Sequence, residues 1–216
     1  MFIYQVEREL ITNLIAKYAH LIKGKTLDVG AGSIKRYKSL YKHITNYTSL
    51  DIDAASKPDI IGDAQKIPVP DNSFDSIVMV QVLHDVYFPD KAIKELNRVV
   101  KKKGVVMVAA PYLSAMCGDA TDYWRFTPNG LTALFKDNNF KIEHLETRGR
   151  FFSVIVQMTT RLFINSLDLY NRKILGRIFS LIFFIFGKLA IFLDEIMDVT
   201  SNKKYGLVTI LVARKI

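Results

Sequence analysis

The stretch KTLDVGAGS, residues 25–33, decides the fold, because a short apolar run leads directly into a glycine-rich turn. The run predicts a strand over Thr26–Val29, and the turn holds Gly30 and Gly32. A dinucleotide-binding turn carries a third glycine three positions later, but this chain has Lys35 there. The turn is therefore a poor cradle for a pyrophosphate, although its two glycines still allow a ligand to approach the backbone.

Two acids follow at positions where a ligand would meet them. Asp51 ends the strand predicted over Tyr47–Ile52 and stands 19 residues past Gly32, about the spacing at which an acid meets a ribose diol. Asp63 lies in GDAQKIP, residues 62–68, after another short strand. We expect the glycine turn and both acids to form one ligand site, while helix capping and turn formation are the alternative roles of the acids.

Apolar runs and helical periodicity alternate along the rest of the chain. Strands that alternate with helices predict an α/β fold with a doubly wound sheet. Further strands are predicted over Ile60–Ile61, Ser76–Val82, Val105–Ala110, Lys141–Glu146 and Leu207–Arg214. Helices are predicted over residues 6–22, Asp90–Val100 and Asn129–Asp137, with a turn at Lys101–Gly104.

Composition limits the classes of protein. The chain has 216 residues, half of them hydrophobic, which suits one α/β domain and excludes a disordered chain. Its net charge of +9 favours contact with phosphate, nucleic acid or a membrane surface. The single cysteine, Cys117, excludes an internal disulfide and a zinc site made of cysteines alone, and we expect no metal. The opening MFIYQVEREL lacks the pattern of a signal peptide, so we expect a reducing, cytoplasmic compartment.

Four segments together resemble one family: LDVGAGS, SLDID, GDAQKIPVPDNSFDSIVMVQVLHDV and ELNRVVKKKGVVMVAAP. They are similar to class I S-adenosylmethionine-dependent methyltransferases, of the small type 11-like kind that often acts in surface glycan and lipid pathways. The resemblance covers roughly residues 24–148 and the last strand. It implies a Rossmann-like, seven-stranded sheet and S-adenosyl-L-methionine as the cofactor.

The same resemblance assigns roles to residues of the expected ligand site. Asp51 would bind the ribose hydroxyls of the cofactor. The methionine portion of the cofactor would lie against Asp28, Gly30 and Gly32. The adenine would lie beside Asp63 and Ala64, and Gln81 and Val82 would form the floor near the reactive methyl group.

The segment DYWRFTPNGL, residues 122–131, resembles a stretch that recurs in this subgroup on the acceptor side. It implies acceptor-side roles for Asp122, Tyr123 and Arg125, whose planar fork suits a carboxylate or phosphate. The alternative is a structural turn in which Arg125 pairs with Asp122.

The chain also departs from its relatives at two places. They often carry histidine where this chain has Cys117, which we expect to be an ordinary small residue, and Glu-His where it has His84-Asp85. We expect the His84 and Asp85 side chains on different faces of their turn. His84 is a candidate base, and a structural histidine is the alternative.

Residues 149–204 predict a helical, apolar insert in the methyltransferase domain, which we expect to span residues 1–148 and 205–216. Two helices are predicted over Phe152–Tyr170 and Ile174–Met197. The uncharged core Ile178–Gly187 is shorter than the roughly 20 residues that span a bilayer. The favoured interpretation is docking on an anionic membrane surface; a spanning helix, a lid and a dimer interface are alternatives. The residues expected at the surface are Arg161, Arg172, Lys173, Arg177 and Lys188, with Phe183, Phe184 and Phe186 on the apolar face.

These observations predict methyl transfer to a lipid-linked or glycan-type small acceptor by a cytoplasmic protein, peripheral at the inner face of the membrane. The alternative is a membrane-docked accessory module that binds the cofactor without turnover. The charge also permits RNA methylation, but the chain shows no appended RNA-binding module, and this disfavours nucleic acid as a partner. Neither the acceptor nor the oligomeric state follows from the sequence.

Overall fold

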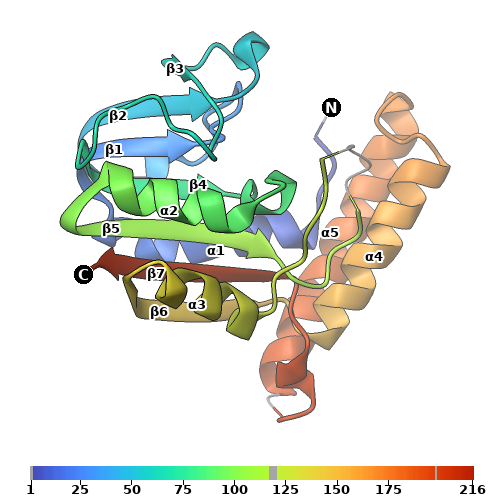
Figure 1. Cartoon of the computed structure of the whole chain (residues 1–216). Helices are drawn as coiled ribbons and strands as arrows, with labels where there is room; N and C mark the ends of the chain where they lie inside the picture. The colour runs from blue at the N-terminus through green and yellow to red at the C-terminus, as the bar shows by residue number, and fades with distance from the viewer. Residues whose placement is uncertain (1, 117–120, 198) are drawn as a thin grey trace.

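A seven-stranded sheet forms the centre of the computed structural model, which describes residues 2–116, 121–197 and 199–216 (Figure 1). The strands from the first edge to β5 are parallel, and β7 runs antiparallel between β5 and β6. Their order is β3 (Ile60–Ile61), β2 (His43–Asp51), β1 (Lys23–Val29), β4 (Phe74–Val80), β5 (Val100–Pro111), β7 (Val208–Lys215) and β6 (Phe140–Arg148). The predicted doubly wound, seven-stranded sheet is confirmed.

Helices cover both faces of the sheet and form two hydrophobic cores. One core packs α2 (Pro89–Val99) and α3 (Pro128–Asp137) against the sheet, and the other packs α1 (Val6–Tyr18). Between β6 and β7, the helices α4 (Phe151–Ser166) and α5 (Lys173–Ile196) form a hairpin beside the carboxyl ends of the parallel strands (Figure 1). The described chain also contains short 3-10 helices, namely η1 (Ala19–Leu21), η2 (Lys38–Leu40), η3 (Ala54–Ser56), η4 (Leu83–Asp85) and η5 (Asn202–Lys204).

The chain around β5 differs from the prediction. The turn expected at Lys101–Gly104 is wrong, because α2 ends at Val99 and β5 begins at the next residue, where Val100 pairs with Phe74. A register shift in the β4–β5 ladder absorbs the irregular residues, with Lys103 at a φ of 63°. Lys101, Lys102 and Lys103 are exposed at this end of β5. The run of lysines therefore belongs to a solvent-exposed strand end and not to a turn.

The strand predicted over Ser76–Val82 is displaced by two residues, since β4 spans Phe74–Val80. It ends at Val80, because Gln81 adopts a left-handed conformation with a φ of 56°. A residue other than glycine is costly in this region, and such conformations cluster at functional sites. Gln81 therefore starts a loop at the carboxyl edge of the sheet.

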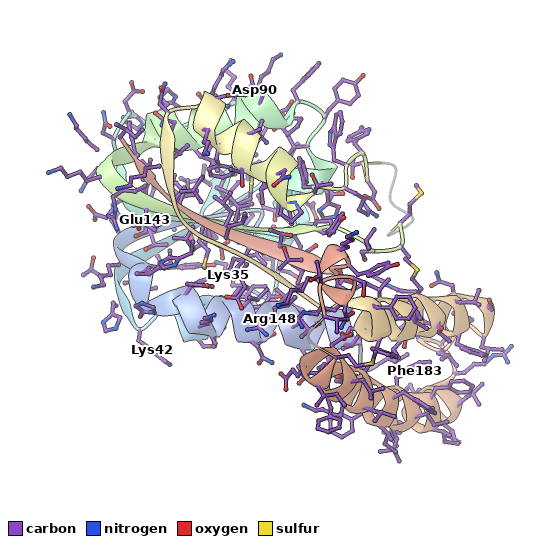
Figure 2. All side chains as sticks on the ribbon, turned by 90° about the horizontal axis from the view of Figure 1, so that it is seen from below. Lys35, Lys42, Asp90, Glu143, Arg148 and Phe183 are labelled. Atoms are coloured by element: carbon purple, nitrogen blue, oxygen red, sulfur yellow. The ribbon has the colours of Figure 1, made fainter. Side chains whose placement is uncertain are left out.

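The α4–α5 hairpin is fixed to the body by specific contacts. The Asp194 carboxylate accepts hydrogen bonds from the backbone N–H groups of Phe152 (3.0 Å) and Ser153 (3.1 Å), which caps α4 with a side chain of α5. Gly187 lies against Tyr4, and a Cβ there would stand 2.5 Å from the tyrosine ring. The hairpin is thus ordered against the N-terminal segment while it projects beyond the sheet (Figure 2).

Helix α5 contradicts two expectations about the insert. Its 24 residues, about 36 Å of helix, have a mean hydropathy of 2.0 over the most apolar 18-residue window, which is long and apolar enough to cross a membrane. The prediction that the apolar run is too short to span is therefore wrong, because the helix continues beyond Arg177 and Lys188. Phe183, labelled in Figure 2, is only 5% exposed and packs near Phe179, so it does not belong to the exposed face.

Candidate functional site

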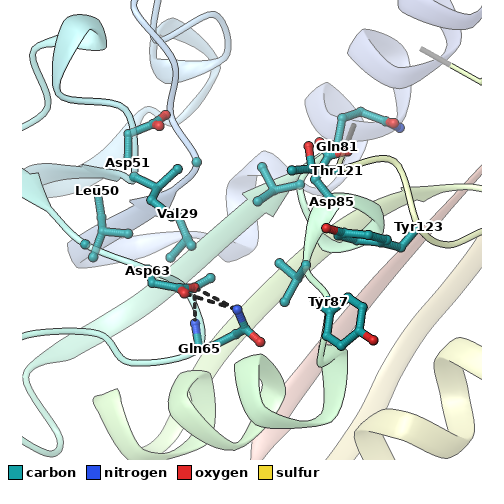
Figure 3. A pocket seen from close by; sticks show the side chains of 16 residues that line it. Val29, Leu50, Asp51, Asp63, Gln65, Gln81, Asp85, Tyr87, Thr121 and Tyr123 are labelled. Atoms are coloured by element: carbon teal, nitrogen blue, oxygen red, sulfur yellow. Dashed lines mark hydrogen bonds between the residues drawn. The ribbon is translucent and has the colours of Figure 1, made fainter. Parts of the chain in front are cut away.

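A cavity of about 430 Å³ opens at the carboxyl ends of β1, β2 and β4 (Figure 3). We call it the cofactor cavity. Seven of the predicted site residues line it, together with Tyr87 and Asp85. The seven are Gly30, Asp51, Asp63, Ala64, Gln81, Val82 and Tyr123.

The glycine turn is shaped by close packing at its first glycine. Gly30 has a φ of 70°, and a Cβ there would stand 2.2 Å from Cγ2 of Val82. Its N–H donates to the Leu50 carbonyl at 2.7 Å, which ties the turn to β2. Gly32 also has a positive φ, 61°, but a Cβ there would meet nothing within 4 Å. Only Gly30 is thus required by both conformation and space.

Asp51 connects the end of β2 to the glycine turn. Its Oδ2 accepts a hydrogen bond from the Gly32 N–H at 2.8 Å, and its Oδ1 accepts one from the Asp53 N–H at 3.0 Å. These bonds hold the carboxylate at the cavity wall, where its remaining lone pairs can accept from a ligand hydroxyl.

Asp63 lies on the same side of the cavity as Asp51 (Figure 3). Its Oδ1 accepts from the backbone N–H of Gln65 at 2.8 Å, and its Oδ2 accepts from the Gln65 side-chain amide at 3.1 Å. Gln65 in turn accepts a hydrogen bond from the Phe88 N–H at 3.1 Å. The acid is thus held in a network that reaches the backbone of Phe88, next to the cavity-lining residue Tyr87.

Asp28 lies outside the described lining of the cofactor cavity. It is buried beneath the glycine turn, and its Oδ2 accepts a hydrogen bond from the Tyr47 hydroxyl at 2.5 Å. Burial raises the pKa of Asp28 to about 6, Asp51 acts in the same direction, and Tyr47 and Lys35 oppose the shift. The predicted contact of Asp28 with the cofactor stays a prediction.

Replacing Asp28 with asparagine should change how stability depends on pH. Because the folded pKa of Asp28 lies above its ordinary value of 3.8, the group stabilises the fold most below about pH 4 and loses that contribution as pH rises through about 6. Asp28→Asn should therefore raise the urea midpoint at pH 7.5 relative to the parent but not at pH 4. Asp90→Asn is the control of opposite sign, because Lys94 and Asn138 lower the pKa of Asp90. A parent-like pH profile in Asp28→Asn would contradict the shift.

A second cavity of about 300 Å³ adjoins the first. We call it the arginine cavity. Gln81 and Asp85 line both cavities, so they stand where the two meet. The arginine cavity is otherwise enclosed by α1, the chain after the glycine turn, the segment after β5, and α4. Its titratable lining includes Glu7, Arg8, Arg36, His84, Asp85, Arg125 and Arg161.

Glu7 organises the wall of the arginine cavity. It is 6% exposed, and its Oε2 accepts hydrogen bonds from the Gln157 amide (3.0 Å) and the Ser114 hydroxyl (3.1 Å). The two bonds join α1 to α4 and to the segment after β5. Burial raises the pKa of Glu7, while Ser114, Arg161 and other arginines oppose that shift.

His84 and Asp85 lie together, and this contradicts the expectation that they point to different faces of the turn. His84 Nε2 is 3.5 Å from Asp85 Oδ1, because η4 turns both side chains toward the second cavity. Ligand atoms of His84, Asp85 and Asp122 lie within 4.8 Å of one another. Asp122 is also paired with Arg125, so its charge is already compensated.

Arg125 has the structural role that the sequence left as the alternative. Its five N–H donors are all engaged: Nη1 and Nη2 by the two Asp122 oxygens, and the remaining three by carbonyl oxygens of Ser114, Ala115 and Trp124. The prediction that the Arg125 guanidinium binds the acceptor is therefore wrong, because all of its N–H donors already have partners within the protein. Arg125 thus joins Ser114 and Ala115 to Asp122 and Trp124. Cys117 lies outside the described residues.

Tyr123 instead lines the cofactor cavity and contacts Tyr87 edge to face, with ring centroids 5.1 Å apart. Figure 3 shows Tyr123, Gln81 and Asp85 on the opposite side of the cavity from Asp51 and Asp63.

Sequence reasoning missed the arginine cavity. One signal was present: Glu7 occupies a position on the buried face of α1, with Leu10, Leu14 and Tyr18, where an apolar residue is expected. Arg8, Arg36 and Arg161 carried no such signal, because they come together only through the packing of segments far apart in the chain.

Comparison with known proteins gives a family match over the part of the chain that supplies most of the cofactor cavity. Residues 27–108 match the family of methyltransferase domains. The curated relatives include ubiquinone/menaquinone biosynthesis C-methyltransferases from Burkholderia cenocepacia (43% identity) and Burkholderia mallei (41%), each over 51 residues. That match covers 24% of this chain and only 21% of the length of these relatives.

Solved structures resemble the whole chain at low identity, which shows the fold alone. A [4+2]-cyclase, SpnF, has a TM-score of 0.62 at 22% identity, over 97% of this chain and 81% of its own. A putative methyltransferase from Bacillus halodurans has a TM-score of 0.61 at 15% identity, over 94% and 98%. Phosphoethanolamine N-methyltransferase 2 from Haemonchus contortus, in complex with S-adenosyl-L-methionine, has a TM-score of 0.59 at 14% identity, over 96% and 52%.

The residues present fit this cofactor. Gly30 and Val82 pack closely at the cavity wall, Asp51 and Asp63 offer acceptors to hydroxyl and amino groups, and the buried Nε2 of Gln81 has no hydrogen-bond partner among the described residues. Residues 27–108 thus match a methyltransferase-domain family, and the chain has the fold of solved methyltransferase structures.

Proposed function

We propose that the protein transfers a methyl group from S-adenosylmethionine to a lipid-linked or glycan-type acceptor at the inner face of a membrane. One observation carries this proposal: the cofactor cavity, the arginine cavity and the exposed apolar hairpin lie at the same edge of the sheet. Arg161 of α4 lines the arginine cavity, so the element that would meet the membrane also builds the site.

Each part of the site has a task in this reaction. Bound S-adenosylmethionine supplies an electrophilic methyl group to a nucleophile of the acceptor. Asp51 and Asp63 hold the cofactor, and Gln81 and Asp85 border the passage through which the acceptor reaches it. Alignment of the reacting groups supplies much of the rate in such a transfer. For a hydroxyl acceptor we assign the base to His84, beside Asp85; a phosphate or carboxylate nucleophile needs none.

The exposed face of α5 supports docking on a membrane. The buried residues of α5 recur on the side of the helix that faces the body, at Gly176, Phe183, Gly187, Ala190 and Asp194. The opposite side carries an exposed apolar ridge, formed by Ile174, Ile178, Leu181, Ile185, Leu189, Phe192 and Ile196. A soluble monomer rarely exposes so long an apolar surface.

Basic residues at one end of the hairpin favour an anionic bilayer. Arg172, Lys173 and Arg177 are exposed near the start of α5, and none forms an ion pair within the described chain. Two of the cations expected at the membrane have other roles: Lys188 pairs with Glu9 at 2.5 Å, and Arg161 faces the arginine cavity. Surface attraction of about 1 kcal/mol per nearby cation adds to burial of the ridge.

The accessory module without turnover remains the second candidate. A [4+2]-cyclase has this fold, so the fold by itself does not set the reaction. Release of S-adenosylhomocysteine in the presence of membranes that contain polyprenyl phosphates and glycolipids separates the two. Turnover above the rate without membranes supports the methyltransferase, and tight cofactor binding without turnover supports the module.

Asp51→Asn tests the cofactor side of the proposal. The loss of charge should weaken S-adenosylhomocysteine binding roughly 10- to 100-fold in titration calorimetry, because charge-assisted hydrogen bonds contribute about 1.5–3 kcal/mol. Asp53→Asn, outside the described lining of the cavity, is the matched control and should bind as the parent does. Equal affinity of Asp51→Asn and the parent would show that Asp51 does not hold the ribose.

A further inference from the structure

The lining of the arginine cavity has an excess of positive charge. Among the described residues that line it are four arginines and two carboxylates, Glu7 and Asp85. Arg125 is paired with Asp122 behind the wall, but Arg8, Arg36 and Arg161 form no ion pair with a carboxylate of the described chain. Glu7 interacts electrostatically with Arg8 and Arg161 but forms no ion pair with either, so three guanidinium groups against two carboxylates leave an excess of positive charge that favours an anionic ligand.

Two buried donors at the cavity are unsatisfied within the part of the chain that the structure describes. The buried Nε of Arg161 and the buried Nε2 of Gln81 have no hydrogen-bond partner among the described residues. A buried donor without a partner costs free energy, so a ligand that offers only acceptors would stabilise both. A phosphate group meets this condition, because its oxygens accept several hydrogen bonds and arginine binds them through two parallel N–H groups.

The three arginines come from separate elements. Arg8 lies on α1, Arg36 follows the glycine turn, and Arg161 lies on α4 of the hairpin. Arg36 is exposed at the mouth, while Arg8 and Arg161 are half-buried. The buried network of Glu7, through Gln157 and Ser114, fixes α1 to α4 and so holds two of the arginines relative to each other.

We propose that the arginine cavity binds a phosphate group of the methyl acceptor through Arg8, Arg36 and Arg161, and presents the acceptor to the cofactor across Gln81 and Asp85. This inference rests on the proposed methyl transfer, since it names the chemistry of its acceptor. It also explains why the insert lies at this edge of the sheet: without α4, the cavity lacks Arg161 and the partner of Glu7.

The phosphate could belong to a lipid or to a soluble compound, and the two sources are separable. One probe is glucose 6-phosphate in buffer, with glucose as the matched neutral compound. The other is polyprenyl phosphate in detergent micelles, with polyprenol as its neutral counterpart. If both phosphates bind, the cavity recognises the phosphate group itself. If polyprenyl phosphate binds more tightly than glucose 6-phosphate, the acceptor is a lipid.

Single substitutions of the arginines test the site on the full chain saturated with S-adenosylhomocysteine. Arg161→Gln and Arg8→Gln should each weaken phosphate binding at least about tenfold in titration calorimetry, and Arg161→Lys should retain part of it. Lys102→Gln is the control, because Lys102 is an exposed cation at the opposite end of β5. Circular dichroism and cofactor affinity are measured on each variant, so that loss of fold is recognised.

Parent-like phosphate binding by Arg161→Gln and Arg8→Gln, or no discrimination between phosphates and their neutral counterparts, would overturn the inference. If the parent binds the cofactor but neither phosphate, the acceptor assignment fails and the methyltransferase stands. If the parent binds phosphate in an arginine-dependent manner but not the cofactor, the anion site stands and the proposed function fails.

Discussion

Gly30→Ala is expected to reduce S-adenosylhomocysteine binding below detection in titration calorimetry. The new Cβ would stand 2.2 Å from Cγ2 of Val82 and 2.8 Å from its Cγ1, so either the turn or the Val82 loop must move. The φ of 70° adds conformational strain. Both the turn and Val82 line the cofactor cavity, and their displacement changes its floor.

Gly32→Ala is the control that separates the steric clash from the backbone strain. Its backbone is strained in the same way, but a Cβ there meets nothing within 4 Å, so the expected cost is only about 1–2 kcal/mol of strain. The double variant Gly30→Ala/Val82→Ala should regain part of the affinity, because the nearest clashing atoms all belong to Val82. Urea midpoints are measured in parallel. If Gly30→Ala binds like Gly32→Ala, the close approach of Val82 does not shape the site.

Serine at three positions of the apolar ridge is expected to release the protein from vesicles that contain phosphatidylglycerol. Ile185, Leu189 and Phe192 are 56%, 48% and 56% exposed, so their replacement should leave the fold intact. Burial of each such side chain contributes about 1.5–3 kcal/mol, and the triple variant should bind vesicles more than about 100-fold more weakly in co-flotation. High salt should reduce binding of the parent as well, through the cations near the start of α5.

The control removes exposed apolar groups elsewhere: Leu145→Ser with Ile216→Ser, on β6 and after β7. This variant should bind vesicles as the parent does. Extraction of the parent by alkaline carbonate supports surface docking, and resistance to it would show that α5 spans the bilayer. A dimer that ignores vesicles would show that the ridge is a protein interface.

The sequence was sufficient for the parts of the site that depend on local pattern. Gly30, Asp51 and Asp63 follow strands whose apolar runs are readable, and parallel strands bring such residues to one edge. The end of β4 could not be predicted from the local pattern, because the left-handed residue that ends it is a glutamine and not a glycine.

The second cavity depends on contacts that no local pattern encodes. Glu7 and Gln157 are 150 positions apart in the chain. Arg125 is occupied partly by backbone carbonyl oxygens, and because every residue carries one, no sequence pattern marks them. The same limit applies within α5, where Phe183 is buried and its neighbour Phe184 is 44% exposed. Their surroundings differ only because Phe183 faces the body.

The position of β7 has a consequence for how the chain reaches its native state. β7 is the last strand in the chain, yet it lies between β5 and β6, inside the sheet. During synthesis the parallel half can assemble early, but β5 and β6 must wait with unpaired edges while the apolar hairpin is made between them. Exposed edges beside an unburied apolar segment are a hazard for aggregation. A nascent chain of this protein therefore carries this hazard until β7 pairs with both β5 and β6.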